Sequence, residues 1–296
     1  MQFELGELDE DVSYRHLTVP ETVDTGEHRQ LAKEAAAQSL VLLQNRELDD
    51  GSAASPPTLP LMGPLCKHRI SPPCRFNNIS DQNISVAVIG PYGKLTQDLL
   101  GEADYVSANY RVDSHSLVDA LAARSQVKVY HEEGCSFKDN CNSSIGIPKA
   151  IAAAQRADVV VFALGLVSCG VHAKTTVPTE CESEGHDRFS IELPGSMPQL
   201  VQAATSSLRR TVPVVCVLFR GGSIAIEPLI SHCDAILDAH HPGQAGATAV
   251  VDAMFGELNP SGRLATTIYP TEFTTSDRPN MTDMRLRGGP ATAGGL

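Results

Sequence analysis

Short apolar runs alternate with amphipathic segments along most of the chain. Continuous apolar runs of about four to eight residues, bounded by Gly, Pro or polar residues, are typical of buried parallel strands. Such runs predict strands at 85–90, 127–134, 158–165, 212–219, 235–241 and 263–269. Apolar residues at helical spacing predict helices at 28–45, 117–125, 148–157, 196–208, 224–230 and 246–256.

This alternation predicts an α/β fold, a layered α/β sandwich with about six mainly parallel strands flanked by helices on both faces. Residues 46–83 are rich in Gly, Ser, Pro and Asn and predict a long loop, and residues 271–296 lose periodicity and predict an irregular tail. Ligands of such sheets bind beyond the carboxyl ends of the strands. Functional residues are therefore expected in the loops that follow the predicted strands.

Composition and charge narrow the function classes. The chain has 296 residues, of which 42% are hydrophobic, enough for the core of one large domain or two small ones. Its formal net charge of -12 opposes binding to phosphate backbones, so no nucleic acid partner is expected. The longest apolar run, 159–167, is about half of the roughly 20 residues that a membrane span needs, so no membrane partner is expected. The first residues are acidic and lack the apolar stretch of a signal peptide, so none is expected within this sequence.

The cysteines and glycosylation sequons favour an oxidising compartment, extracellular or in the secretory pathway. The chain has eight cysteines. Two pairs in polar loops are candidate disulfides, Cys66 with Cys74 and Cys135 with Cys141, and Cys169 and Cys181 flank a third loop. Cys216 lies in the middle of a predicted strand and is expected to be a buried free thiol. Candidate glycosylation sites are Asn78, Asn83 and Asn142, and a further sequon is at Asn280.

The loop after strand 158–165 carries the strongest candidate chemistry. It contains four carboxylates within eight residues, followed by an arginine: Glu180, Glu182, Glu184, Asp187 and Arg188. Mutual repulsion raises the proton affinity of one carboxyl in such a cluster, as a general acid requires. Arg188 is expected to hold Asp187 ionised in a bidentate pair. Two interpretations stay open here, a solvated acidic loop and an acid/base site; the length of the loop favours the second.

The other loops give weaker signals. The turn GPYG at 90–93 lacks the GxGxxG pattern of a dinucleotide site, and GGSIA at 221–225 lacks the second glycine of a GxSxG serine nucleophile. His240 and His241 are adjacent at a strand end and point to opposite faces, so joint metal binding is not expected and one is interpreted as structural. No CxxC is present, and neither a metal nor a cofactor is expected.

Several segments together resemble the second, C-terminal domain of glycoside hydrolase family 3. The resembling segments are HRQLAKEAAAQSLVLLQN (28–45), SVAVIGPYG (85–93), ADVVVFALGL (157–166), ESEGHDRFSIELPGSMPQLV (182–201), HHPGQAGATAVVDAMFGELNPSGRLATTIYP (240–270) and MTDMRLR (281–287). The last three are the most specific. ELNPSGRLATTIYP and MTDM resemble the β-xylosidase/α-arabinofuranosidase branch more than the β-glucosidases.

The resemblance implies a retaining glycosidase with two carboxylates. The family's aspartate nucleophile lies on a preceding (β/α)8 barrel, and its acid/base glutamate comes from this second domain. Matching ExEGxDR assigns the acid/base to Glu184, with Glu182 as the alternative, and gives Asp187 and Arg188 a role in positioning the loop. The implied partners are an oligosaccharide or aryl glycoside substrate and the N-terminal barrel of the same protein.

The resemblance also implies a domain division. Residues 1–27 resemble the tail of a barrel with its linker, 28–270 the α/β sandwich domain, and 271–296 an irregular tail. Because this sequence includes no barrel, the chain alone is expected to be inactive. The competing hypothesis is a non-catalytic α/β domain that binds carbohydrate or protein. The glycone stays open among xylose, arabinose and glucose.

Overall fold

The computed structural model describes residues 22, 24–46, 83–96, 115–139, 141–167, 181–182, 188–209 and 211–275. Within these ranges the strands form one sheet, in the order β1-β6-β5-β4-β2-β3. The strands are β1 (Val41–Asn45), β2 (Ile84–Ile89), β3 (Val127–Glu132), β4 (Val159–Gly165), β5 (Val214–Phe219) and β6 (Ala235–Asp238). Every pairing is parallel except that of β1 with β6.

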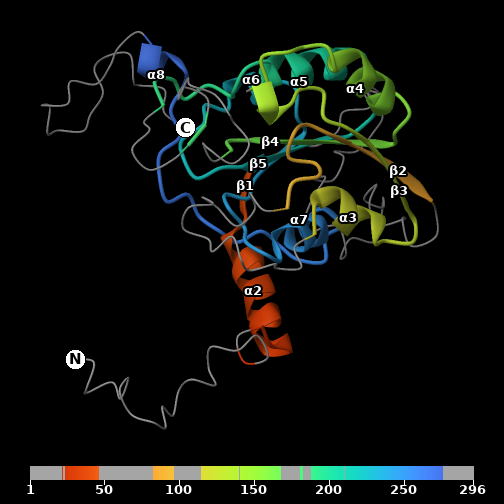
Figure 1. The fold of residues 1–296 in the computed structure, drawn as a ribbon, viewed down its shortest axis with the longest axis vertical. Helices are drawn as coiled ribbons and strands as arrows, with labels where there is room; N and C mark the ends of the chain where they lie inside the picture. The colour runs from red at the N-terminus through yellow and green to blue at the C-terminus, as the bar shows by residue number, and fades with distance from the viewer. Residues whose placement is uncertain are drawn as a thin grey trace, which may run out of the picture.

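Helices cover both faces of this sheet (Figure 1). α3 (Leu117–Ala122) and α7 (Gly246–Met254) lie on one face, and α4 (Ile147–Ala154), α5 (Met197–Ser206) and α6 (Glu227–Ile230) lie on the other. α2 (Gly26–Ser39) packs beside α7, where Lys33 forms a 2.8 Å ion pair with Asp252. Two short helices, η5 (Phe137–Asp139) and α8 (Glu272–Thr275), lie in connections. The predicted layered α/β sandwich with a mainly parallel sheet is confirmed.

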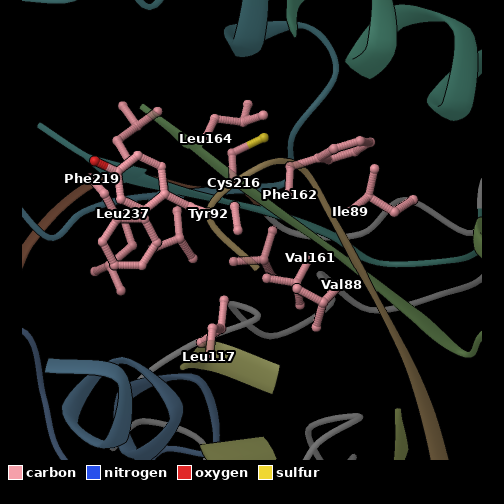
Figure 2. Close-up of a cluster of buried hydrophobic side chains, with 14 of the residues drawn as sticks. Val88, Ile89, Tyr92, Leu117, Val161, Phe162, Leu164, Cys216, Phe219 and Leu237 are labelled. Carbon is pink, nitrogen blue, oxygen red and sulfur yellow. The ribbon is translucent and has the colours of Figure 1, made fainter. Parts of the chain in front are cut away.

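The central strands are buried on both faces, which explains their uninterrupted apolar sequences. Every residue of β4, β5 and β6 is buried. Tyr92, which follows β2, closes one end of this core: its ring stacks on Phe219 at 4.9 Å and meets Phe137 edge-on at 5.3 Å (Figure 2). Its hydroxyl donates to the carbonyl of Leu166, so the start of the loop after β4 is fixed to the core.

A close backbone approach at the end of β2 requires glycine. Gly90 has a φ of 121°, and a Cβ there would lie 2.2 Å from the carbonyl oxygen of Ala163 in β4. From β2 the chain continues to β3 on one side, and from β4 it continues to β5 on the other, so the connections after these two neighbouring strands leave in opposite directions. Such a switch point is where ligands bind in open α/β sheets.

The helix predicted over 28–45 is wrong in its last third, residues 40–45. α2 ends at Ser39, Leu40 has extended backbone angles, and Val41–Asn45 form β1 on the open edge of β6. A short apolar run such as Val41–Leu43 does not distinguish helix from strand by its spacing. Here pairing with the free edge of β6 makes Val41–Asn45 a strand.

The strand predicted over 263–269 is also absent from the described residues. β1 already occupies the edge of β6, and residues 263–267 are exposed without a sheet pairing. The neighbouring Gly262 N–H donates to the carbonyl of Leu40 at 2.9 Å, so this segment runs past the start of β1. Other predicted elements are present with shorter bounds, and the predicted 46–83 loop lies outside the described residues apart from residues 46 and 83.

The expectation that Cys216 is a free thiol is wrong. Cys216 in β5 is joined to Cys233, in the connection just before β6. Its position in a strand hid this pairing, because the partner comes from the adjacent connection after α6. Among the described helices, none is both long and apolar enough to cross a bilayer.

Candidate functional site

The loop after β4 leaves the carboxyl edge of the sheet and returns to the point where it started. The N–H of Glu182 donates to the carbonyl of Val167 at 3.0 Å. The adjacent Leu166 is held by the Tyr92 hydroxyl, and Cys181 is disulfide-bonded. Both described ends of the loop over 168–181 therefore lie side by side, next to the ends of β4 and β5.

The carboxylate of Glu182 is bound by three hydrogen-bond donors. The N–H of Gly221 lies 2.8 Å from Oε1, and the N–H of Gly222 lies 2.5 Å from Oε2. The Nε2 atom of His241 lies 2.6 Å from Oε1. These donors come from the connections after β5 and β6, so Glu182 joins three loops at one edge of the sheet.

Two opposing effects set the pKa of Glu182. Burial raises its pKa, because a charged carboxylate loses solvation. The hydrogen bonds from His241 and from the N–H of Gly222 lower the pKa by more, so it lies below the ordinary value of a glutamate. Glu182 is therefore an ionised hydrogen-bond acceptor at neutral pH.

A buried ion pair supports the turn that binds Glu182. Arg220 is 3% exposed and Asp238 is fully buried, and the Arg220 guanidinium donates to the Asp238 carboxylate through Nε and Nη2. Nη1 of Arg220 donates to the carbonyl of Gly222 at 2.8 Å. Nε2 of His240 lies 3.6 Å from Asp238, and burial lowers the pKa of His240. This network fixes Gly221 and Gly222 against the ends of β5 and β6.

Arg188 binds backbone carbonyls. Its Nη1 donates to the carbonyl of Ser223 at 3.0 Å, and its Nη2 donates to the carbonyl of Glu192. Asp187, the expected partner of Arg188, lies outside the described residues, and so does Glu184. Among the predicted site residues of this loop, the structure thus describes Glu182 and Arg188.

The remaining candidate residues lie elsewhere. Cys135 and Cys141 are joined in a disulfide with a Cα–Cα distance of 4.7 Å. Asn83 and Asn142 are exposed. Cys66, Cys74 and Asn78 lie outside the described residues.

Sequence reasoning did not assign Gly221, Gly222 and His241 to the site. The signal was a pair of glycines directly after a buried strand. Successive backbone N–H groups at such a position form an anion-binding concavity. Testing the glycine pair only as part of a serine nucleophile motif missed that chemistry, and one of His240 and His241 was interpreted as structural without a site role for either.

The family model for the glycosyl hydrolase family 3 C-terminal domain matches residues 40–291. The chain belongs to glycosyl hydrolase family 3. The match covers most of the chain, including the Glu182 cluster and every strand of the sheet.

Named relatives of this family 3 domain include xylosidases from fungi and plants. The chain is 34% identical over 274 residues to the probable exo-1,4-β-xylosidase bxlB of Aspergillus terreus. It is 31% identical over 275 residues to β-xylosidase/α-L-arabinofuranosidase 1 of Medicago sativa subsp. varia. Each comparison covers 92% of this chain and 29% of the relative, so the chain spans about three tenths of these proteins.

Solved structures of family 3 enzymes share the fold. An exo-β-xylosidase (XlnD) in complex with a xylobiose aziridine activity-based probe matches with a TM-score of 0.65 and 26% identity, over 96% of this chain and 30% of that one. A β-glucosidase of Bifidobacterium adolescentis matches with a TM-score of 0.61 and 26% identity, over 88% of this chain and 32% of that one. The chain is thus similar to the C-terminal part of glycosidases.

Proposed function

We propose that this domain supplies the general acid/base of a retaining β-xylosidase-like glycosidase, and that Glu184 is that residue. The single observation that carries the proposal is the attachment of Glu182 and Arg188 to one turn at the carboxyl edge of the sheet. The N–H groups of Gly221 and Gly222 hold Glu182, and the carbonyl of Ser223 holds Arg188. Glu184 lies between these two attached residues in the sequence.

The described contacts also favour Glu184 over Glu182 as the acid. A general acid must hold a proton near neutral pH and release it to the leaving oxygen. The pKa of Glu182 lies below the ordinary range, because the hydrogen bonds from His241 and Gly222 outweigh the effect of burial. Glu184 is thus the better candidate of the two.

A retaining mechanism requires a second carboxylate about 5–5.5 Å from the first, acting as nucleophile. We assign this nucleophile to an N-terminal (β/α)8 barrel of the same protein. The relatives are about three times as long as the stretch they share with this chain, which leaves room for such a domain.

Substrate and location follow from the relatives and the cysteines. The proposed substrates are β-xylosides of the xylan or arabinoxylan type, since relatives at 31–34% identity carry xylosidase and arabinofuranosidase names. The proposed location is the secretory pathway or the extracellular space. The Cys135–Cys141 and Cys216–Cys233 disulfides and the exposed sequons at Asn83 and Asn142 support it.

The test is Glu184→Gln in the full-length protein that contains this chain. Hydrolysis of an alkyl xyloside, whose leaving group needs protonation, is expected to fall by about 10²–10⁴-fold, the usual contribution of a general acid. Glycosylation of the nucleophile by an aryl xyloside with an acidic phenol is expected to slow far less. Initial rates and pre-steady-state bursts on both substrates measure the difference.

Glu192→Gln serves as the matched control, since it changes the same charge on an exposed side chain eight positions along. An unchanged alkyl xyloside rate in Glu184→Gln would contradict the assignment. A wild-type full-length protein that binds xylooligosaccharides without hydrolysing any glycoside would instead identify a carbohydrate-binding domain.

A further inference from the structure

The turn after β5, residues 220–223, binds the loop that follows β4 at two points. It donates hydrogen bonds at one point and accepts a hydrogen bond at the other. Its Gly221 and Gly222 N–H groups donate to Glu182 at 2.8 and 2.5 Å. Its Ser223 carbonyl accepts from Arg188 at 3.0 Å. A carboxylate and a guanidinium six positions apart in the chain therefore attach to one short turn, which we call the β5 turn.

We propose that Glu182 is a positioning residue, whose carboxylate binds the β5 turn and His241 and so attaches the loop after β4 to the carboxyl edge of the sheet. Arg188 attaches to the same turn through the carbonyl of Ser223. The statement that this loop carries the acid/base rests on the proposed function; the anchoring by Glu182 does not.

The donors around Glu182 disfavour an acid/base role for it. Both oxygens already accept hydrogen bonds from backbone N–H groups, and Oε1 also lies 2.6 Å from His241 Nε2. A backbone N–H can only donate, so a proton on Oε2 would face the donors at Gly221 and Gly222, and charge-assisted hydrogen bonds would be lost.

The β5 turn is built for a carboxylate at this position. A Cβ on Gly221 would lie 2.9 Å from His241 Nε2 and 3.0 Å from Glu182 Oε1, and a Cβ on Gly222 would lie 3.2 Å from Glu182 Oε2. A side chain at Gly221 therefore requires His241 or Glu182 to shift, and one at Gly222 requires a smaller shift of Glu182. Behind the turn, Arg220 ties the Gly222 carbonyl to the buried carboxylate of Asp238.

Hydrogen–deuterium exchange of the 296-residue chain tests the anchor directly. Glu182→Gln keeps the shape of the side chain but removes its charge and turns an amide NH2 toward the backbone donors. Exchange at the Gly221 and Gly222 amides is expected to accelerate about 10- to 100-fold, the factor expected from losing hydrogen bonds to a charged acceptor. The β2 and β4 amides are expected to keep their protection, which shows that the variant is folded.

Glu192→Gln is the matched control and is expected to leave these amides unchanged. Gly221→Ala provides a second route to the same effect, because its Cβ crowds both His241 and the Glu182 carboxylate without altering the charge of Glu182. Unchanged exchange at Gly221 and Gly222 in Glu182→Gln, and at Gly222 in Gly221→Ala, would overturn the anchor, whatever the chain catalyses.

A kinetic comparison in the full-length protein separates positioning from proton transfer. Glu182→Gln is expected to lower kcat about 10-fold or more. The rate is still expected to decrease at high pH with the same apparent pKa as in the wild type, since the general acid is unchanged. Glu184→Gln is expected to remove that decrease. Loss of the decrease in Glu182→Gln would overturn its role as a positioning residue. Faster exchange at Gly221 and Gly222 in Glu182→Gln, together with full activity in Glu184→Gln, would support the anchor and overturn the proposed function.

Discussion

Glu182 and Glu184 lie two positions apart in the chain, and sequence reasoning gave both the same candidate role. Their difference arises from partners that are distant in sequence: Gly221 and Gly222 are 39 and 40 positions from Glu182, and His241 is 59 positions away. The acidic cluster was visible in the sequence. The partners were not, because only the parallel sheet brings the ends of β4, β5 and β6 to one edge.

The lowered pKa of Glu182 predicts a pH-dependent contribution to stability. Burial alone would raise this pKa, but the hydrogen bonds from His241 and Gly222 lower it overall. The folded state therefore prefers the ionised form. The resulting stabilisation is fully present above the pH where an unfolded glutamate titrates, about 4.3, and is lost as the pH falls through the lower folded pKa.

Urea unfolding of wild type and Glu182→Gln measures this contribution. The difference in unfolding free energy is expected to be about 1–3 kcal/mol at pH 7 and to shrink as the pH falls below about 4. The other titratable or charged groups near Glu182 are His241, which donates through Nε2, and the Arg220, Asp238 and His240 group behind the β5 turn. A difference that stays constant from pH 7 to below pH 4 would contradict an ionised Glu182.

At the scale of elements, the sequence predicted the central strands better than the edge. β2, β4 and β5 are uninterrupted apolar runs because helices cover both faces, and their positions were found within a few residues. At the edge, Val41–Asn45 and 263–269 both had apolar residues suited to pairing with β6. Val41–Asn45 takes this edge, and Gly262 just before the later segment is hydrogen-bonded to Leu40 at the start of β1, a long-range arrangement that a local pattern does not contain.

The Cys216–Cys233 disulfide is a further link between elements. It joins β5 to the connection before β6 across a separation of 17 residues, and both cysteines are buried. Closing a loop of this length stabilises the folded state by about 3 kcal/mol in the chain-entropy model. The double variant Cys216→Ala, Cys233→Ala is therefore expected to lose about 2–4 kcal/mol of unfolding free energy, measured by urea denaturation.

The Cys135–Cys141 pair provides the control for this prediction. Its separation is six residues, so the same model gives the double alanine variant a loss about 1 kcal/mol smaller. Peptide mapping without reductant is expected to recover the peptides of Cys216 and Cys233 as one linked species. Alkylation of Cys216 in the denatured, unreduced protein would contradict the disulfide.

At the scale of the whole molecule, two carboxylates at the carboxyl edge of the described sheet are bound by other protein groups. Glu182 accepts hydrogen bonds from three donors, and Asp238 is fully buried against Arg220. Neither is free to attack an anomeric carbon. The two buried or hydrogen-bonded carboxylates are therefore poor candidates for the nucleophile, which agrees with its proposed place on the barrel.

The last prediction concerns the activity of the chain by itself. Retaining hydrolysis needs a nucleophile and an acid/base about 5–5.5 Å apart, and we assign the nucleophile to the barrel. The 296-residue chain alone is therefore expected to release no phenol from an aryl xyloside, whereas the full-length protein is expected to turn over at about 1–10³ per second, as typical enzymes do. Mixing the chain with a separately produced barrel is expected to restore part of that rate, and Glu184→Gln in the added chain is expected to slow alkyl xyloside hydrolysis. Turnover by the chain alone at the full-length rate would place both carboxylates within these 296 residues and would refute the division of the site between two domains.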